Sequence, residues 1–257
     1  MLTKLVYLLW RPGREDRART RELLLGQVAP RLLEDGVAQL SMNIADPESK
    51  MRAPAPRLTR EPPICAELSL WLEQPEERRA AIEETLTALG FRLAGYLVEE
   101  TLYTDYGENS HATPRAWPDG ARSPGVMMVT LLERPRRIPL EEWMRRWHGV
   151  MSPVSESLQP RTRYLRNLVL RSLTPGAPAL QAIVEEAWPS PRHVSNPFLF
   201  YRAHGPVELV LHLARILRAV LSFLDLHRIR ITPTGEYLLK TDASVPRARR
   251  SSYDRYC

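Results

Sequence analysis

The sequence has little of what defines several protein classes. Its 257 residues include two cysteines, too few for a disulfide framework or a cysteine-rich zinc site. No apolar run reaches the ~18 residues of a membrane-spanning helix. The apolar start, residues 1–10, lacks the basic segment and cleavage site of a signal peptide. Neither a GxGxxG pattern nor a P-loop occurs, so nothing indicates a bound nucleotide. We therefore expect a soluble, cytoplasmic protein with no membrane partner.

Lysine is also scarce, because 33 of the 36 basic residues are arginine. The formal charge of +6 is uneven: residues 1–122 carry 16 positive and 19 negative groups, whereas residues 123–257 carry 20 and 11. Acidic residues interrupt the arginines, and no strand shows the aromatic pattern of RNA-binding sheets. We expect no nucleic-acid partner. The positive second half instead favours a substrate that carries a carboxylate or an enolate.

Hydrophobic periodicity predicts one order of elements twice: strand, helix, strand, strand, helix, strand. In the first half we expect strands at 2–10, 37–44, 64–72 and 91–103, with helices at 15–33 and 75–89. In the second half we expect strands at 125–132, 164–173, 179–188, 228–231 and 237–239, with helices at 139–147 and 207–226. Gly149 is expected to turn the chain after the first of these helices.

This order is the ferredoxin-like, or split βαβ, topology. Its sheet has helices on one face only, so two such sheets can cover each other face to face. The predicted fold class is α+β: two ferredoxin-like β-α-β-β-α-β repeats that form an intrachain pseudo-dimeric α/β barrel. The predicted domains are a divergent N-terminal repeat (1–106), a linker (107–124), a C-terminal repeat (125–240) and a basic, disordered tail (241–257).

Three short motifs follow one another in the second half. They are Glu-Glu-Trp143…Arg-Trp147-His148…Pro153, then Tyr164-Leu-Arg-Asn167, then Ile183-Val-Glu185-Glu…Trp188. Together they resemble the EthD family of the dimeric α/β-barrel superfamily, over about residues 125–240. In that family a helix with Trp and His precedes a Pro-containing loop, a Tyr-x-x-Asn strand and an Ile-x-Glu strand. The first half has no matching histidine, so chemistry that belongs to this histidine would occur once per chain.

The resemblance implies a pocket but no single reaction, because the superfamily includes cofactor-independent monooxygenases of aromatic polyketides, polyketide cyclases, lyases and haem-dependent enzymes. A neutral His148 can act as general base or acid near neutral pH. Tyr164 and Asn167 can donate hydrogen bonds to a substrate oxygen. The alternatives are a histidine that stabilises a helix end, and a tyrosine and asparagine that satisfy local backbone groups.

Further side chains are predicted to bind substrate. Glu185 and Glu186 are neighbours on a strand and face opposite sides, and we prefer Glu185 because it shares a face with Ile183. His193 lies in a loop that can reach the site, although a solvated histidine is the simpler interpretation. The substrate-binding set is Trp143, Trp147, Arg163, Glu185, Trp188 and His193.

The predicted function is a small-molecule enzyme for an oxygenated aromatic or polyketide-like substrate. It would use cofactor-independent acid/base chemistry: cyclisation, elimination or oxygenation. The alternative is a non-catalytic ligand-binding or accessory protein of an oxygenase or polyketide pathway. His204, His212 and His227 lack metal-ligand spacing, so we expect no metal. We expect no cofactor, with haem and flavin left open, and a homodimer remains an option.

Overall fold

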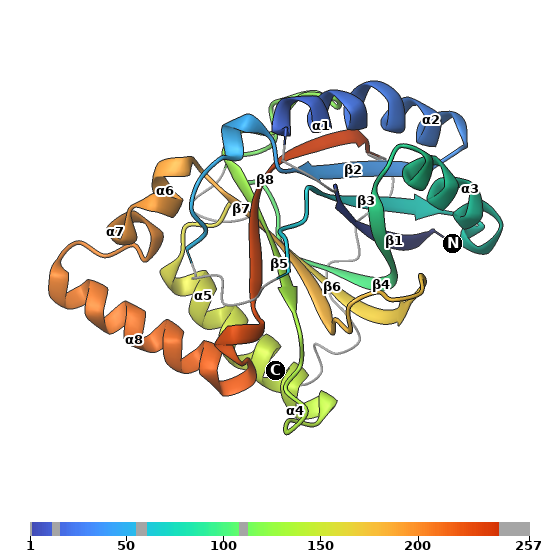
Figure 1. Cartoon of the computed structure of the whole chain (residues 1–257). Coiled ribbons are helices and arrows are strands. Elements are labelled where there is room, and N and C mark those ends of the chain that lie inside the picture. Colours follow the sequence, from blue (N-terminus) through green and yellow to red (C-terminus); the bar gives the residue numbers. More distant parts are fainter. Residues whose placement is uncertain (1, 12–15, 55–60, 108–112, 242–257) are drawn as a thin grey trace.

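Eight antiparallel strands close into a barrel with helices on its outside (Figure 1). The computed structural model describes residues 2–11, 16–54, 61–107 and 113–241. The strands are β1 (Thr3–Trp10), β2 (Gln39–Ile44), β3 (Ala66–Leu72), β4 (Arg92–Thr104), β5 (Val126–Leu132), β6 (Arg163–Ser172), β7 (Ala182–Trp188) and β8 (Arg230–Lys240). The α-helices are α1 (Arg17–Leu23), α2 (Ala29–Glu34), α3 (Pro75–Ala88), α4 (Leu140–Arg146), α5 (Ser152–Leu158), α6 (Pro191–Ser195), α7 (Pro197–Phe200) and α8 (Pro206–Phe223). Two π-helical turns, η1 (Leu24–Val28) and η3 (Trp147–Met151), and two 3-10 turns, η2 (Pro47–Ser49) and η4 (Leu226–Arg228), complete the set.

The strand order around the barrel is β1-β3-β2-β8-β5-β7-β6-β4. Within each half, the first strand pairs with the third and the fourth: β1 with β3 and β4, and β5 with β7 and β8. The halves join where β2 meets β8 and where β4 meets β6. Strands β4 and β8, at 13 and 11 residues, are the longest of the eight, and each pairs with one strand of its own half and one of the other. Closure leaves none of these eight described strands with a free edge, and the predicted α+β barrel is confirmed.

The helix expected at 139–147 does not end at Gly149. It continues as α4, η3 and α5 to Leu158. Within η3 the backbone N–H of Ser152 bonds to the carbonyl of Trp147, five residues back. A proline lacks an N–H and clashes with the carbonyl four residues before it, so this wider π turn keeps Pro153 within the helix.

The first half also contains a π turn just before a proline within a helix. There the N–H of Ala29 bonds to the carbonyl of Leu24, and Pro30 follows. Other differences from the predicted elements are small. Helices α6 and α7 lie in a segment expected to be a loop, and the last strand is one continuous element instead of two. The predicted tail, apart from Thr241, and residues 108–112 of the predicted linker lie outside the described residues.

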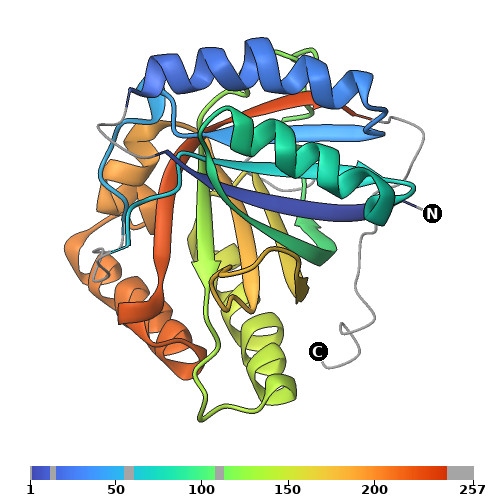
Figure 2. The same ribbon diagram turned by 45° about the vertical axis from the view of Figure 1, so that its right-hand side comes forward.

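Helices cover the two halves of the barrel differently (Figure 2). Helices α1, α2 and α3 lie across the first-half strands, and the space between is filled by aliphatic side chains such as Leu40, Leu68 and Leu70 against Leu24 and Leu32. On the second half, α4, α5 and α8 cover the sheet. None of the helices in the described ranges combines the length and apolar character needed to cross a membrane.

Candidate functional site

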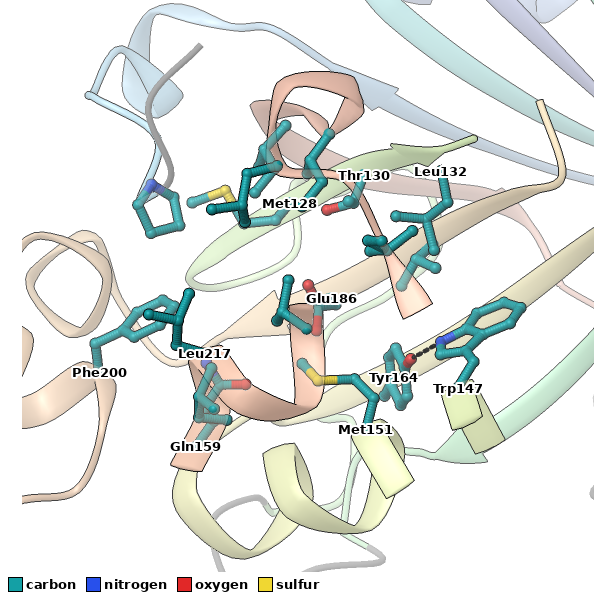
Figure 3. Close-up of a pocket in the computed structure, with 18 of the residues that line it drawn as sticks. Met128, Thr130, Leu132, Trp147, Met151, Gln159, Tyr164, Glu186, Phe200 and Leu217 are labelled. Atoms are coloured by element: carbon teal, nitrogen blue, oxygen red, sulfur yellow. Dashed lines mark hydrogen bonds between the residues drawn. The ribbon is translucent and has the colours of Figure 1, made fainter. Parts of the chain in front are cut away.

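A cavity of about 300 Å³ lies between the second-half sheet and helix α8 (Figure 3). Its walls come from the outward faces of β5, β6, β7 and β8, from η3, α7 and α8 and the segments next to them, and from Pro54 of the first half. Its size is at the lower end of the ~300–1,000 Å³ typical of small-molecule pockets. Most of the wall is aliphatic or aromatic, and its polar side chains are Thr130, Gln159, Tyr164 and Glu186, joined by the phenol of Tyr201 and the indoles of Trp147 and Trp188.

Tyr164 and Glu186 are the central polar pair of the cavity. They lie directly opposite each other in the register of β6 and β7. Side chains of a strand alternate between its two faces, and residues opposite each other across a ladder share a face. Both side chains therefore point away from the barrel interior and toward α8, into one space (Figure 3).

Three neighbours hold the ring and hydroxyl of Tyr164. The indole Nε1 of Trp147 donates a hydrogen bond to the hydroxyl oxygen at 3.1 Å. The Arg161 guanidinium lies 4.0 Å from the ring centroid, and Tyr103 packs edge-on with its centroid at 5.5 Å. No described residue accepts the proton of the hydroxyl. Tyr164 can therefore donate this proton to a ligand oxygen.

Glu186 is oriented by the same arginine. Arg161 Nη1 donates to Glu186 Oε1 at 2.8 Å, and its Nη2 donates to Ser155 Oγ at 2.8 Å. Arg161 is only 1% exposed, so this ion pair lies in a poorly solvated wall. Within the described part of the chain, no hydrogen bond involves Glu186 Oε2. That oxygen is available to accept a proton or a hydrogen bond from a ligand.

Two further polar atoms of the cavity residues are buried without a partner in the described residues. They are the hydroxyl of Thr130 and the indole nitrogen of Trp188, whose ring stacks on Phe200 at 4.3 Å. Buried polar groups in native proteins nearly always have a partner, protein or water. Because both residues line the cavity, both groups can bond to a ligand or a water there.

His148 is buried beside the cavity but does not line it. Its ring packs 4.8 Å from that of Trp147, which does line it. Burial, and then the nearby charge of Arg166, lower the pKa of His148 to about 3. The imidazole is therefore neutral at physiological pH, and neither ring nitrogen has a partner among the described residues.

Two other predicted substrate-binding residues also lie outside the cavity wall. Trp143 is fully buried and packs against Trp147 and Phe223, at 4.9 and 5.8 Å between ring centroids. His193 was expected in a loop, but it lies in α6. Its Nδ1 is 2.9 Å from Ser190 Oγ. Burial, and then the charge of Arg192, lower the pKa of His193. Of the predicted set, Trp147, Tyr164 and Trp188 line the cavity.

Glu185, Asn167 and Arg163 face the other way, into the barrel interior. Glu185 was the preferred carboxylate, but the structure places Glu186 on the cavity and Glu185 across the sheet from it. Asn167 is three residues from Tyr164 on the same strand, so the two side chains lie on opposite faces. The sequence carried a usable signal: Trp188 shares the parity of Glu186 on β7, and both line the cavity.

The barrel interior holds a buried ionic cluster that joins the two halves. Lys4 Nζ lies 2.7 Å from Glu100 Oε2 and 3.3 Å from Glu185 Oε1. Asn167 Nδ2 donates to Glu185 Oε1 at 2.9 Å. Burial alone raises the pKa of Glu185, but the charges of Lys4 and Arg163 outweigh it, and the net pKa is lowered.

Glu67 lies in the same barrel interior, but its pKa is raised, whereas that of Glu185 is lowered. Burial, and then the charge of Glu185, raise the pKa of Glu67 to about 8. Asn43 Nδ2 bridges the two carboxylates, at 2.5 Å from Glu67 Oε2 and 3.1 Å from Glu185 Oε2. Ser69 Oγ donates to Glu67 Oε1 at 2.6 Å. These groups form a structural cluster on the side of the sheet away from the cavity.

The described residues contain no group of three or more His, Cys, Asp or Glu side chains placed to hold a metal ion.

Nothing in the sequence pattern distinguishes Arg161 from Arg163, which faces the interior and pairs with Glu236. Arg161 instead lies behind the cavity and contacts both Tyr164 and Glu186.

No protein-family model matches the chain, and no curated protein is similar to it in sequence. Among solved structures, the fold of this chain is similar to that in a crystal structure of an anthrone oxidase-like protein. It is 11% identical, with a TM-score of 0.48, and the match covers 95% of this chain and 97% of that chain.

Proposed function

We propose that the second-half cavity binds a small, mainly apolar, oxygenated ring compound and catalyses a proton transfer on it. The observation that supports this most directly is the pairing of Tyr164 and Glu186 across β6 and β7 on the cavity wall. Tyr164 has a hydroxyl proton to donate, and Glu186 has a carboxylate oxygen to accept one. The apolar wall excludes water and strengthens both interactions.

The proposed step is removal of a proton from a carbon next to a carbonyl group. Glu186 Oε2 takes the proton, the C–H electron pair moves toward the carbonyl carbon, and the carbonyl oxygen becomes an enolate oxygen. Tyr164 donates a hydrogen bond to this oxygen, with Thr130 close by on β5. The step needs no cofactor. Cyclisation, elimination or oxygenation of the substrate would then start from this enolate.

We assign His148 a positioning role in this scheme. Its ring packs on Trp147, and the Trp147 indole N–H donates to the hydroxyl of Tyr164. Because the pKa of His148 is lowered to about 3, it is a weak base at neutral pH. Its contribution is to hold Trp147, and through it the Tyr164 hydroxyl, in one orientation.

We also propose that the two halves are tandem repeats related to the EthD family. Two observations support this. Each half joins its strands in the same order, and each carries a π turn followed two residues later by a proline, Pro30 in one and Pro153 in the other. Among the described residues, the cavity then belongs to the second copy, because aliphatic side chains fill the corresponding space in the first.

The second candidate is a non-catalytic ligand-binding protein. The observation that favours it is the ion pair between Glu186 and the buried Arg161, which also suits a fixed hydrogen-bond acceptor. In this case the cavity would retain a hydroxylated ligand without chemical change. The predicted oxygenase or polyketide pathway would then use the protein as a carrier or accessory subunit.

Deuterium exchange separates the two candidates without knowledge of the natural substrate. The probe is 2-tetralone, a two-ring ketone with acidic C–H groups, incubated with the protein in D₂O and followed by proton NMR. The proposed enzyme incorporates deuterium faster than buffer, and the exposed variant Glu141→Gln leaves this rate unchanged. Binding detected by calorimetry with exchange at the buffer rate would favour the carrier. If 2-tetralone shows no binding and no exchange above the buffer rate, both candidates are contradicted.

A further inference from the structure

Gln159 lines the cavity with a side-chain amide that the described residues leave without a partner. The residue directly follows α5, and its backbone N–H bonds to the carbonyl of Ser155. Only 6% of Gln159 is exposed. Within the described part of the chain, no hydrogen bond involves its amide oxygen or its amide nitrogen. An unpaired buried amide costs free energy, so the side chain of Gln159 needs a ligand or a water in the cavity to satisfy it.

Gln159 and Tyr164 lie toward different ends of the cavity. In Figure 3, Tyr164 is on one side of Glu186, beside Trp147, and Gln159 is on the other side, toward Phe200. The carboxylate of the proposed base therefore lies between two polar contacts, the phenol at one end and the amide at the other.

The register of the strands agrees with this view. Tyr164 is level with Glu186 in the ladder of β6 and β7. Two residues earlier, the N–H of Thr162 bonds to the carbonyl of Ala187, which is one residue further along β7. Because the two strands are antiparallel, the chain that leads from Gln159 enters the sheet beyond the Tyr164–Glu186 level, toward the C-terminal end of β7.

The cavity wall carries little charge. Among the described residues that line it, Glu186 is the only charged side chain. Arg161, behind the wall, is already paired with Glu186 and Glu156. A ligand anion would lose its hydration in the apolar cavity and would face a second carboxylate, and both effects weaken its binding. The positive charge of the second half therefore does not line the described wall, which suits a neutral ligand.

We propose that Gln159 determines substrate specificity, and that the substrate is a neutral ring ketone with a second oxygen at the end remote from the carbonyl. Tyr164 holds the carbonyl oxygen, Glu186 faces the C–H group next to it, and the Gln159 amide donates to the remote oxygen. An amide suits this oxygen because its N–H groups donate without adding a charge to the apolar wall. The place of the carbonyl rests on the proposed function, whereas the polar contact at Gln159 depends only on the cavity.

Calorimetry of the full chain with matched probes tests this assignment. The probes are 2-tetralone, 6-hydroxy-2-tetralone, whose hydroxyl is remote from the carbonyl, and 8-hydroxy-2-tetralone, whose hydroxyl lies near the reacting CH₂ group. Wild type is expected to bind the 6-hydroxy probe about three- to tenfold more tightly than the other two, the effect of one neutral hydrogen bond. A fourth probe, 6-carboxy-2-tetralone, is ionised at neutral pH and should bind about tenfold more weakly than the 6-hydroxy probe.

Gln159→Leu keeps the approximate size of the side chain but removes both polar groups. We expect this variant to bind the 6-hydroxy probe about three- to tenfold more weakly than wild type does. It should bind 2-tetralone more tightly, because a bound ligand no longer leaves a buried amide unpaired. A loss of fold would weaken the binding of both probes, so these opposite changes identify the contact. The matched control is Gln27→Leu, the same change at an exposed residue of η1, which should keep the wild-type preference.

Several outcomes would overturn the assignment. Equal affinity of wild type for 2-tetralone and the 6-hydroxy probe would show that water satisfies Gln159. A preference that persists in Gln159→Leu would place the contact on another residue, and tighter binding of the carboxylate would show a subsite for anions. Absence of binding by every probe would also overturn it. Failure of the proposed chemistry gives a different result: deuterium exchange stays at the buffer rate while wild type still prefers the 6-hydroxy probe.

Discussion

The guanidinium of Arg161 packs over the ring of Tyr164 at 4.0 Å, while its Nη1 donates to Glu186 at 2.8 Å. One buried cation therefore holds both polar groups that face each other across the cavity. Arg161 is itself held by Ser155 and Glu156 of α5. Tyr164 and Glu186 lie on two adjacent strands, and Arg161, in the short connection between α5 and β6, is fixed by its contacts with α5.

Tyr164→Phe removes the proposed donor to the enolate oxygen and leaves the ring packing in place. A hydrogen bond to a charged group contributes ~1.5–3 kcal/mol, so we expect the exchange of 2-tetralone to slow by about 10- to 100-fold. The control is Tyr103→Phe, which alters a residue that packs on Tyr164 but does not line the cavity. Equal rates for Tyr164→Phe and wild type would remove Tyr164 from the mechanism.

Arg161→Lys keeps the positive charge but loses the planar group that contacts both Tyr164 and Glu186. We expect kcat for deuterium exchange to fall about tenfold, with KM for 2-tetralone changed by less than about threefold. We expect kcat to fall because the orientation of the reacting groups is lost, and KM to change little because the apolar wall that binds 2-tetralone stays. A general loss of fold would instead lower the midpoint of thermal unfolding and impair both constants, so both measurements are made on the same sample.

His148 should stay neutral throughout the physiological range. Its pKa, lowered to about 3 by burial and by Arg166, predicts no change in its imidazole NMR signals between pH 5 and 8. The His148→Asn spectrum assigns these signals. Because the folded-state pKa is below the unfolded value of 6.5, the stability that this residue contributes is present above pH 6.5 and is lost as the pH falls toward 3. A titration near pH 6.5 would show that the ring is solvated.

The raised pKa of Glu67 predicts that the free energy of unfolding decreases as the pH rises through about 8. Its folded-state pKa of about 8 lies above its ordinary value of 4.5, so its contribution is complete below pH 4.5 and is lost as the pH rises through 8. The groups around it are Glu185, Lys4, Asn43 and Ser69. In Glu67→Gln, the midpoint of thermal unfolding should fall less between pH 6 and 9 than in wild type. The exposed Glu77→Gln should keep the wild-type slope, and an identical slope for Glu67→Gln would contradict the assignment.

The sequence was sufficient for the barrel because apolar periodicity reports which strands and helices exist, and the order of elements restricts how they pair. It was insufficient at Gly149, where a glycine and a following proline resemble a helix end. In the π turn the N–H of Ser152 bonds to the carbonyl of Trp147, five residues back, and this lets the helix continue past Pro153. This hydrogen bond depends on backbone geometry that composition does not reveal.

At the candidate site, the residues predicted from the sequence divide between the two faces of the sheet. Trp147, Tyr164 and Trp188 were predicted and line the cavity. Glu185 was chosen over Glu186 by its likeness to a family motif, whereas strand parity with Trp188 selects Glu186. The role of Arg161 depends on side-chain packing between α5, β6 and β7, which no local pattern encodes.

The exchange rate of Glu186→Gln, measured with 2-tetralone in D₂O beside wild type and Glu141→Gln, tests the central claim most directly. Glutamine preserves the size of the side chain and its contact with the cavity but cannot accept the proton. We predict that 2-tetralone still binds, and that exchange falls to the buffer rate while Glu141→Gln matches wild type. Exchange at the wild-type rate in Glu186→Gln would show that Glu186 is not the base.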